Sequence, residues 1–98
     1  MPDYTMRNKI RRLSVIVYLL SRRSYTYAKL TDKINYMMDE QFCKSSIEKD
    51  VKLLRDEFDC PIERATNQVD SATGQKGLII NEKYDFGSKL IEWIEFFH

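Results

Sequence analysis

The side chains best suited to polar recognition are concentrated on one short stretch of the sequence, residues 44–58. Apolar residues recur there at spacings of four, three and four, which predicts a helix with one buried face formed by Ile47, Val51, Leu54 and Phe58. The opposite side of that helix would present polar residues, namely Ser45, Lys49, Lys52 and Asp56. Lysine neutralises phosphate or reaches the acceptor atoms of guanine, and serine hydroxyls bond base edges or phosphates. We therefore expect base contacts from Lys44, Ser45, Ser46, Lys49 and Lys52.

A second interpretation of these lysines stays open. Lysines on an exposed helix face are common in any soluble protein. Glu48 also lies four residues before Lys52, which is the spacing of an ion pair within a helix. In that case the two lysines would only solubilise the helix.

The sequence offers little for catalysis or metal binding. The single histidine is His98, the last of 98 residues, so a Ser-His-Asp relay would depend on a chain end that tends to fray. The two cysteines, Cys43 and Cys60, are too few for a Cys/His zinc site, which needs about four ligands. We expect no catalysis, no metal and no cofactor. Free thiols favour a reducing cytoplasm, and the longest apolar run, Leu13 to Leu20, is too short to span a membrane.

Positive charge is concentrated at the start of the chain, although the net charge is only +1. Residues 1–29 hold one acid, Asp3, against seven basic residues: Arg7, Lys9, Arg11, Arg12, Arg22, Arg23 and Lys29. Such asymmetry suggests a polyanionic partner, although a solvated arginine-rich helix face explains it equally well. Tyrosine hydroxyls at a helix start can also bond phosphate, unless the rings belong to the core. The expected phosphate contacts are Arg11, Arg12, Arg22, Arg23, Tyr25, Tyr27, Arg64 and Lys76.

The periodicity predicts two helices before the one described above. Residues 4–21 place apolar side chains inward at spacings of three and four, namely Met6, Ile10, Leu13, Val17 and Leu20. A second helix would follow a Thr26 cap and run to about residue 38, with Leu30, Ile34 and Met37 inward. The third helix would begin near residues 43–46, where Ser45 and Glu48 could form a capping box.

The pattern of apolar and polar residues changes after Pro61. Two short apolar stretches near residues 62–66 and 77–81 flank a polar turn and predict a hairpin. A last helix is expected at residues 89–98. The order α-α-α-β-β-α predicts a mainly helical fold with a small β-hairpin, which is the order of a winged helix-turn-helix.

The third helix also carries a family pattern. Residues 46–55 read SIEKDVKLLR and are followed by Phe58, Pro61-Ile62-Glu63 and Gly77-Leu78. Over about residues 8–86 the chain resembles the N-terminal winged helix-turn-helix of WYL-type and DeoR-like bacterial transcription regulators. The resemblance implies a DNA-binding domain at residues 1–86, followed by a C-terminal helix at 87–98. It implies a cytoplasmic, nucleoid-associated regulator that binds specific sequences of double-stranded DNA.

The sequence departs from the family at several positions. Cys43 stands where the family has a capping serine, Lys49 replaces an arginine, and Leu78-Ile79 replaces a tyrosine pair. Asp50 is distinctive because it is acidic within the apolar spacing. We expect it to pair with an arginine, or to accept backbone hydrogen bonds, and so to orient the third helix.

The last predicted helix is apolar on most sides, so it must be covered on most sides. We expect it to pack beside the first helix and to form a homodimer, whose interface would comprise Val15, Tyr18, Leu19, Leu90, Trp93, Ile94 and Phe97. The alternative is a fragment in which a further domain covers this helix. An alternative for the whole chain is a winged-helix module that binds a partner protein rather than DNA.

Overall fold

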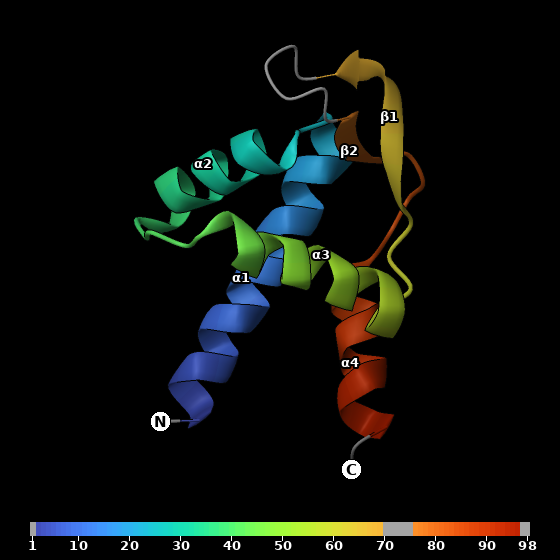
Figure 1. Cartoon of the computed structure of the whole chain (residues 1–98). Coiled ribbons are helices and arrows are strands. Elements are labelled where there is room, and N and C mark those ends of the chain that lie inside the picture. Colours follow the sequence, from blue (N-terminus) through green and yellow to red (C-terminus); the bar gives the residue numbers. More distant parts are fainter. Residues whose placement is uncertain (1, 70–75, 97–98) are drawn as a thin grey trace.

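Four helices and one antiparallel pair of strands make up the part of the chain that the computed structural model describes, residues 2–69 and 76–96 (Figure 1). The order is the predicted one: α1 Pro2–Arg22, α2 Tyr27–Met38, α3 Lys44–Glu57, β1 Ile62–Val69, β2 Lys76–Ile80 and α4 Phe86–Phe96. None of these described helices is both long enough and apolar enough to cross a membrane.

The core lies where the first three helices meet. Its most deeply buried apolar residues are Ile16 and Leu20 on α1, Leu30 and Ile34 on α2, and Ile47, Val51 and Leu54 on α3. The inward residues predicted for α3, including Phe58 just after it, are all buried, which confirms that periodicity. Met37 was expected inward but is 45% exposed, because Thr31 rather than Met37 completes the buried face of α2.

The helix starts are set by short side chains. The Thr26 cap is confirmed, because its Oγ1 accepts a hydrogen bond from the Lys29 N–H at 3.3 Å. The capping box predicted for α3 is wrong: Cys43 is the N-cap residue, and no side chain caps this end. Helix α4 begins at Phe86 instead of residue 89, because Asp85 accepts hydrogen bonds from the Ser88 N–H at 3.2 Å and from the Ser88 hydroxyl at 2.8 Å.

The strands pair in an antiparallel register that joins Ile62 to Ile80 and Ala65 to Gly77, with an irregularity before Val69. The connection between α1 and α2 adds a single bridge to this sheet. Tyr25 and Leu78 exchange two backbone hydrogen bonds, at 3.0 and 2.7 Å. Gly77 permits this approach, since a Cβ there would lie 3.3 Å from the Ser24 Cβ. The bridge fastens the hairpin to the helical core.

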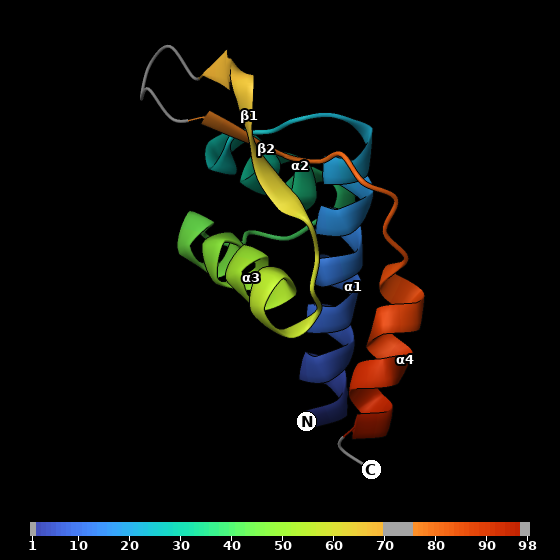
Figure 2. The same cartoon turned by 90° about the vertical axis from the view of Figure 1, so that its right-hand side faces the viewer.

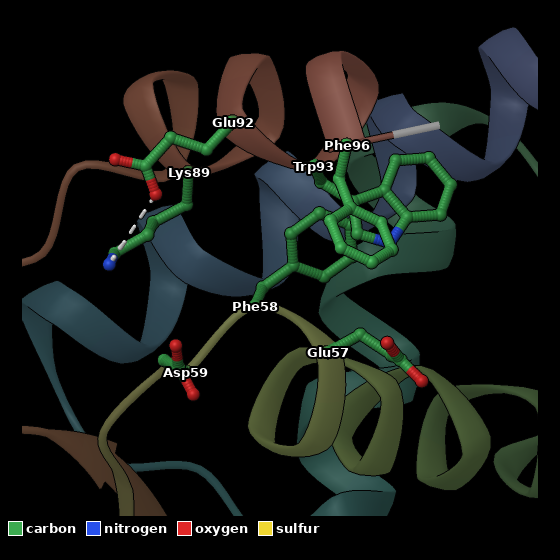
Figure 3. Close-up of a pocket in the computed structure, with 7 residues that line it drawn as sticks. All are labelled: Glu57, Phe58, Asp59, Lys89, Glu92, Trp93 and Phe96. Carbon is green, nitrogen blue, oxygen red and sulfur yellow. Dashed lines mark ion pairs between the residues drawn. The ribbon is translucent and has the colours of Figure 1, made fainter. Parts of the chain in front are cut away.

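Helix α4 packs on the end of α3 through aromatic rings. The Phe58 ring lies 5.3 Å from that of Phe86 and 5.4 Å from that of Trp93, and Figure 3 shows Phe58 and Trp93 with their rings together. The Tyr84 hydroxyl donates to the Phe58 carbonyl. Figure 2 shows α3 and the far ends of the strands on one side of the molecule and α4 on the other, with α1 between them. The predicted boundary between residues 86 and 87 therefore falls at the start of α4, where Phe86 belongs to the core.

Candidate nucleic-acid interface

The outward face of α3 is exposed as predicted. Lys44, Ser45, Lys49 and Lys52 are all exposed, and Ser46 is half-buried. Within the described part of the chain, no hydrogen bond or ion pair involves the side chain of any of the three lysines. The ion pair that Glu48 and Lys52 could have formed is therefore absent. The three ammonium groups remain available to an external anion.

A buried ion pair fixes the position of α3. Asp50 is 1% exposed, and both its carboxylate oxygens accept hydrogen bonds from Arg12 on α1, one of them from Nη2 at 3.0 Å and the other from Nε. The expected pairing of Asp50 with an arginine is confirmed. The same finding corrects the expectation for Arg12, because a guanidinium held by a buried carboxylate serves the fold and is not directed at phosphate.

The same arginine reaches the turn before α3. Its guanidinium carbon lies 4.6 Å from the centre of the Phe42 ring. Asn35 on α2 closes this turn from the other side: its side-chain amide donates to the Phe42 carbonyl at 3.0 Å, and its oxygen accepts from the Phe42 N–H at 2.8 Å. Asn35, Phe42, Arg12 and Asp50 thus connect α2, α1 and α3. The role of Asn35 in holding this turn was not predicted, because nothing in the neighbouring sequence distinguishes it from an ordinary asparagine within a helix.

Tyr27 joins the start of α2 to the flank of α3. Burial raises the pKa of the half-buried Tyr27 hydroxyl, and Glu48 adds to that effect, whereas Arg55 and Arg64 oppose it. The hydroxyl therefore stays protonated and can donate a hydrogen bond. Arg55 on α3 and Arg64 on β1 are both close enough to Tyr27 for their charges to act on its hydroxyl. Arg55 was not among the predicted contacts, although it follows Glu48 by seven residues and so shares its helix face.

The basic groups on this side outnumber the acidic ones. The exposed charged residues of α3 and β1 are five cations, namely Lys44, Lys49, Lys52, Arg55 and Arg64, and four acids, namely Glu48, Asp56, Glu57 and Glu63. We call the five cations, together with Glu48, Asp56, Ser45, Ser46 and Tyr27, the α3 face. Figure 2 shows that the far ends of β1 and β2 extend toward the same side of the molecule as α3.

Other predicted phosphate contacts lie elsewhere. Arg22 and Arg23 stand at the end of α1, which Figure 2 places away from the outward side of α3. They line a pocket with Tyr25, whose backbone is held by β2. Arg11 is exposed and, by its spacing of eleven from Arg22, shares that side of α1. The side chain of Lys76 lies outside the described residues. Among the predicted phosphate contacts whose side chains the structure describes, Tyr27 and Arg64 are the two that belong to the α3 face.

Cys43 marks the beginning of α3. It is exposed, and its sulfur lies 3.2 Å from the Ser45 hydroxyl oxygen and 3.4 Å from that of Ser46. Hydrogen bonds from these two hydroxyls, that of Ser45 first, lower the pKa of the Cys43 thiol to about 7. Burial instead raises the pKa of Cys60 to about 12. The two cysteines should therefore differ sharply in reactivity.

Alkylation by iodoacetamide is expected to modify Cys43 alone in the folded protein. Because the thiolate is the reacting species, the rate should be half-maximal near pH 7, the pKa of the Cys43 thiol, and should level off about one pH unit higher. Mass spectrometry over a pH series measures this, with Cys43→Ser as the control that should remain unmodified. A rate that keeps climbing to about pH 8.5 and above, as for an ordinary thiol, would contradict the expectation.

The residues expected at a dimer interface do not form one surface. Leu19 is only 3% exposed and belongs to the chain's own core, so its assignment to an interface is wrong. Val15, Leu90 and Trp93 are partly buried against the same core. Tyr18 is 53% exposed beside Arg22, and Ile94 is 40% exposed on α4. The expectation for Phe97 falls outside the described residues.

No protein-family model, no curated protein and no solved structure matches this chain. Among the residues whose side chains are described, no three His, Cys, Asp or Glu side chains gather where they could hold a metal ion. A functional proposal therefore depends on the chain's own geometry and charge.

Proposed function

We propose that this protein is a transcriptional regulator that binds specific sequences of double-stranded DNA through a winged helix-turn-helix. In this proposal α2 and α3 form the helix-turn-helix, α3 enters the major groove, and β1 and β2 form the wing. The protein acts by occupying DNA and carries out no catalysis, without cofactor or metal. It works in the cytoplasm, at the bacterial nucleoid.

One observation carries the proposal. The outward side of α3 holds three lysines that have no partner among the described residues, on a helix whose orientation is fixed by the Arg12–Asp50 pair. A rigidly placed helix with unpaired lysines suits a groove bordered by phosphates, because its backbone needs little reordering on binding. The element order and the side of the molecule taken by the hairpin support it further (Figure 2).

The roles on the α3 face follow from chemistry and position. Lys49 and Lys52 point away from the core at the middle of α3, so we assign them to base edges together with Lys44, Ser45 and Ser46 at its start. Arg64 on β1 and the Tyr27 hydroxyl at the start of α2 flank the helix. Contacts from such flanking positions go to phosphate and fix the register of the protein on DNA.

A fluorescence anisotropy titration with genomic duplex fragments tests the proposal. If all five basic residues of the α3 face displace counterions, log affinity should fall against log salt with a slope of about −4.5. Between 50 and 200 mM salt that slope corresponds to a loss of about 500-fold. Affinity that is absent even at low salt would overturn the proposal and favour a module that binds a partner protein instead.

We further propose that two copies associate through α4. Leu90 and Trp93 cover one side of this helix against the core, which leaves Ile91 59% and Ile94 40% exposed on the next. A two-fold contact would bury both isoleucines. It would also set two α3 helices about 34 Å apart, one turn of DNA, over a pseudo-palindromic site.

Light scattering is expected to give twice the monomer mass for the wild type. Ile91→Glu with Ile94→Glu should yield folded monomers that bind DNA more weakly, because the interface would then have to bury charge. Lys83→Glu, on an exposed connection, is the matched control and should leave the mass unchanged. A wild-type protein that remains monomeric at tens of micromolar would contradict the dimer.

A further inference from the structure

A second basic surface lies at the end of α1 and the adjoining side of α2. It is formed by Tyr18, Arg22, Arg23, Lys33, Tyr36 and Met37, which we call the α1–α2 surface. Two neighbouring pockets lie in this surface, with volumes of about 340 and 390 Å³. Tyr25 and Lys33 line both of them. Each is large enough to take a side chain or two from another molecule.

No ion pair with a described residue neutralises the positive charge of this surface. Arg22, Arg23, Lys29 and Lys33 are all exposed where they line the pockets, and the one acid that lines them is Asp32. The ion pairs among the described residues are those of Arg12 with Asp50 and of Lys89 with Glu92, neither of which lies here. The surface therefore carries a surplus of about three positive charges by this count of its lining residues.

The pockets are apolar between these cations. Tyr36 is 81% exposed, Tyr18 53% and Met37 45%, and buried Leu19 contributes to the lining of the first pocket. Exposed apolar groups bordered by charge are typical of sites where another molecule binds. Arg22 already lies over the Tyr18 ring at 5.4 Å, and Lys33 over the Tyr36 ring at 5.7 Å. One face of each ring is thus occupied by a cation.

We propose that the α1–α2 surface binds an acidic polypeptide segment of a partner protein, one that carries large apolar side chains. The carboxylates of the segment would meet Arg22, Arg23 and Lys33 at the rim, and an apolar side chain would enter the pocket between Leu19 and Met37. Opposite charge steers such an encounter, and the buried apolar contact holds it. This binding goes beyond DNA recognition and does not require it.

The observations favour a polypeptide over a single-stranded nucleic acid. Bases would need the flat faces of the tyrosines, and Arg22 and Lys33 cover one face of each. A phosphate backbone would leave the apolar pocket unfilled. The end of α1 also points away from the outward side of α3, so DNA and the acidic segment could be held together (Figure 2).

Titration of a labelled synthetic peptide tests the proposal. The probe consists of glutamate and aspartate around a pair of leucines, and it is added to the whole chain without DNA. The variant Arg22→Glu with Lys33→Glu should weaken binding by about tenfold or more, because it sets like charges against each other. The matched control, Lys49→Glu with Lys52→Glu on the α3 face, should bind the peptide as the wild type does. Circular dichroism verifies that both variants fold.

Four results would overturn the proposal. The first is an equal loss of peptide affinity in the two variants, which would indicate attraction by net charge alone. The second is equal binding of a peptide in which serines replace the leucines, and the third is tighter binding of a single-stranded oligonucleotide. The fourth is self-association that disappears in Arg22→Glu with Lys33→Glu, which would make a second copy of this chain the occupant. Unchanged DNA binding in the α3 control would count against the proposed function and leave the peptide-binding proposal intact.

Discussion

Replacing Asp50 by alanine is expected to destabilise the protein by about 3 kcal/mol, because it leaves the Arg12 guanidinium without its carboxylate partner in a largely buried site. The side chain of Arg12 is 16% exposed and keeps its contact with the Phe42 ring, which places the loss toward the lower end of the range for buried pairs. For a chain of this length, such a loss corresponds to a fall in Tm of about 12–24 °C. Thermal and urea denaturation followed by circular dichroism measure it.

Two comparisons separate this ion pair from general damage to α3. Asp56→Ala removes an exposed carboxylate from the same helix and should change stability by no more than about 0.5 kcal/mol. The double replacement Arg12→Met with Asp50→Leu should cost less than Asp50→Ala alone, since no unpaired charge remains buried. Equal stability of Asp50→Ala and Asp56→Ala would show that the buried pair contributes little.

The double variant Lys49→Ala with Lys52→Ala is expected to lose about 2 to 4 kcal/mol of DNA-binding free energy, a weakening of about 30-fold or more. Both side chains are exposed and have no partner among the described residues, so their removal should leave the fold unchanged. Loss of a base contact also relaxes sequence preference. Anisotropy titrations with a selected duplex and with random duplex therefore measure both effects.

The matched control removes the same charge from other surfaces. Lys33→Ala with Lys83→Ala changes two exposed lysines, one on the α1–α2 surface and one before α4. Its affinity should stay within about threefold of the wild type at physiological salt, where distant charges are screened. Unchanged DNA affinity in Lys49→Ala with Lys52→Ala would mean that α3 is not the recognition helix.

The spacing of apolar residues predicted the inward side of a helix best where only one face of that helix is buried. Helix α3 touches the core on a single side, so its apolar spacing identified every fully buried apolar residue of that helix. Helix α1 contacts α2, α3 and β2, and its buried side is correspondingly wider. The fully buried Ile16 therefore fell outside the predicted set. The start of α4 had a usable signal, because Asp85 lies three residues before Ser88 as in a capped helix.

The roles of the arginines could not be predicted locally. Arg11 and Arg12 are neighbours in sequence, yet they point in directions about 100° apart around the helix axis. Only the contact with Asp50, 38 residues away, gives Arg12 its structural role. The separation of Arg22 and Arg23 from the α3 face likewise depends on how α1 crosses the other helices. Spacing along the chain carries no information about that crossing.

The backbone bridge between Tyr25 and Leu78 has a consequence for the order in which the molecule assembles. Its two hydrogen bonds join the connection after the first helix to the last strand, across most of the chain. During synthesis the helices α1, α2 and α3 are complete long before β2 emerges from the ribosome. The early chain therefore leaves the backbone of Tyr25 without its strand partner. Closing so long a loop makes completion of the sheet a late event, slower than the docking of the three helices.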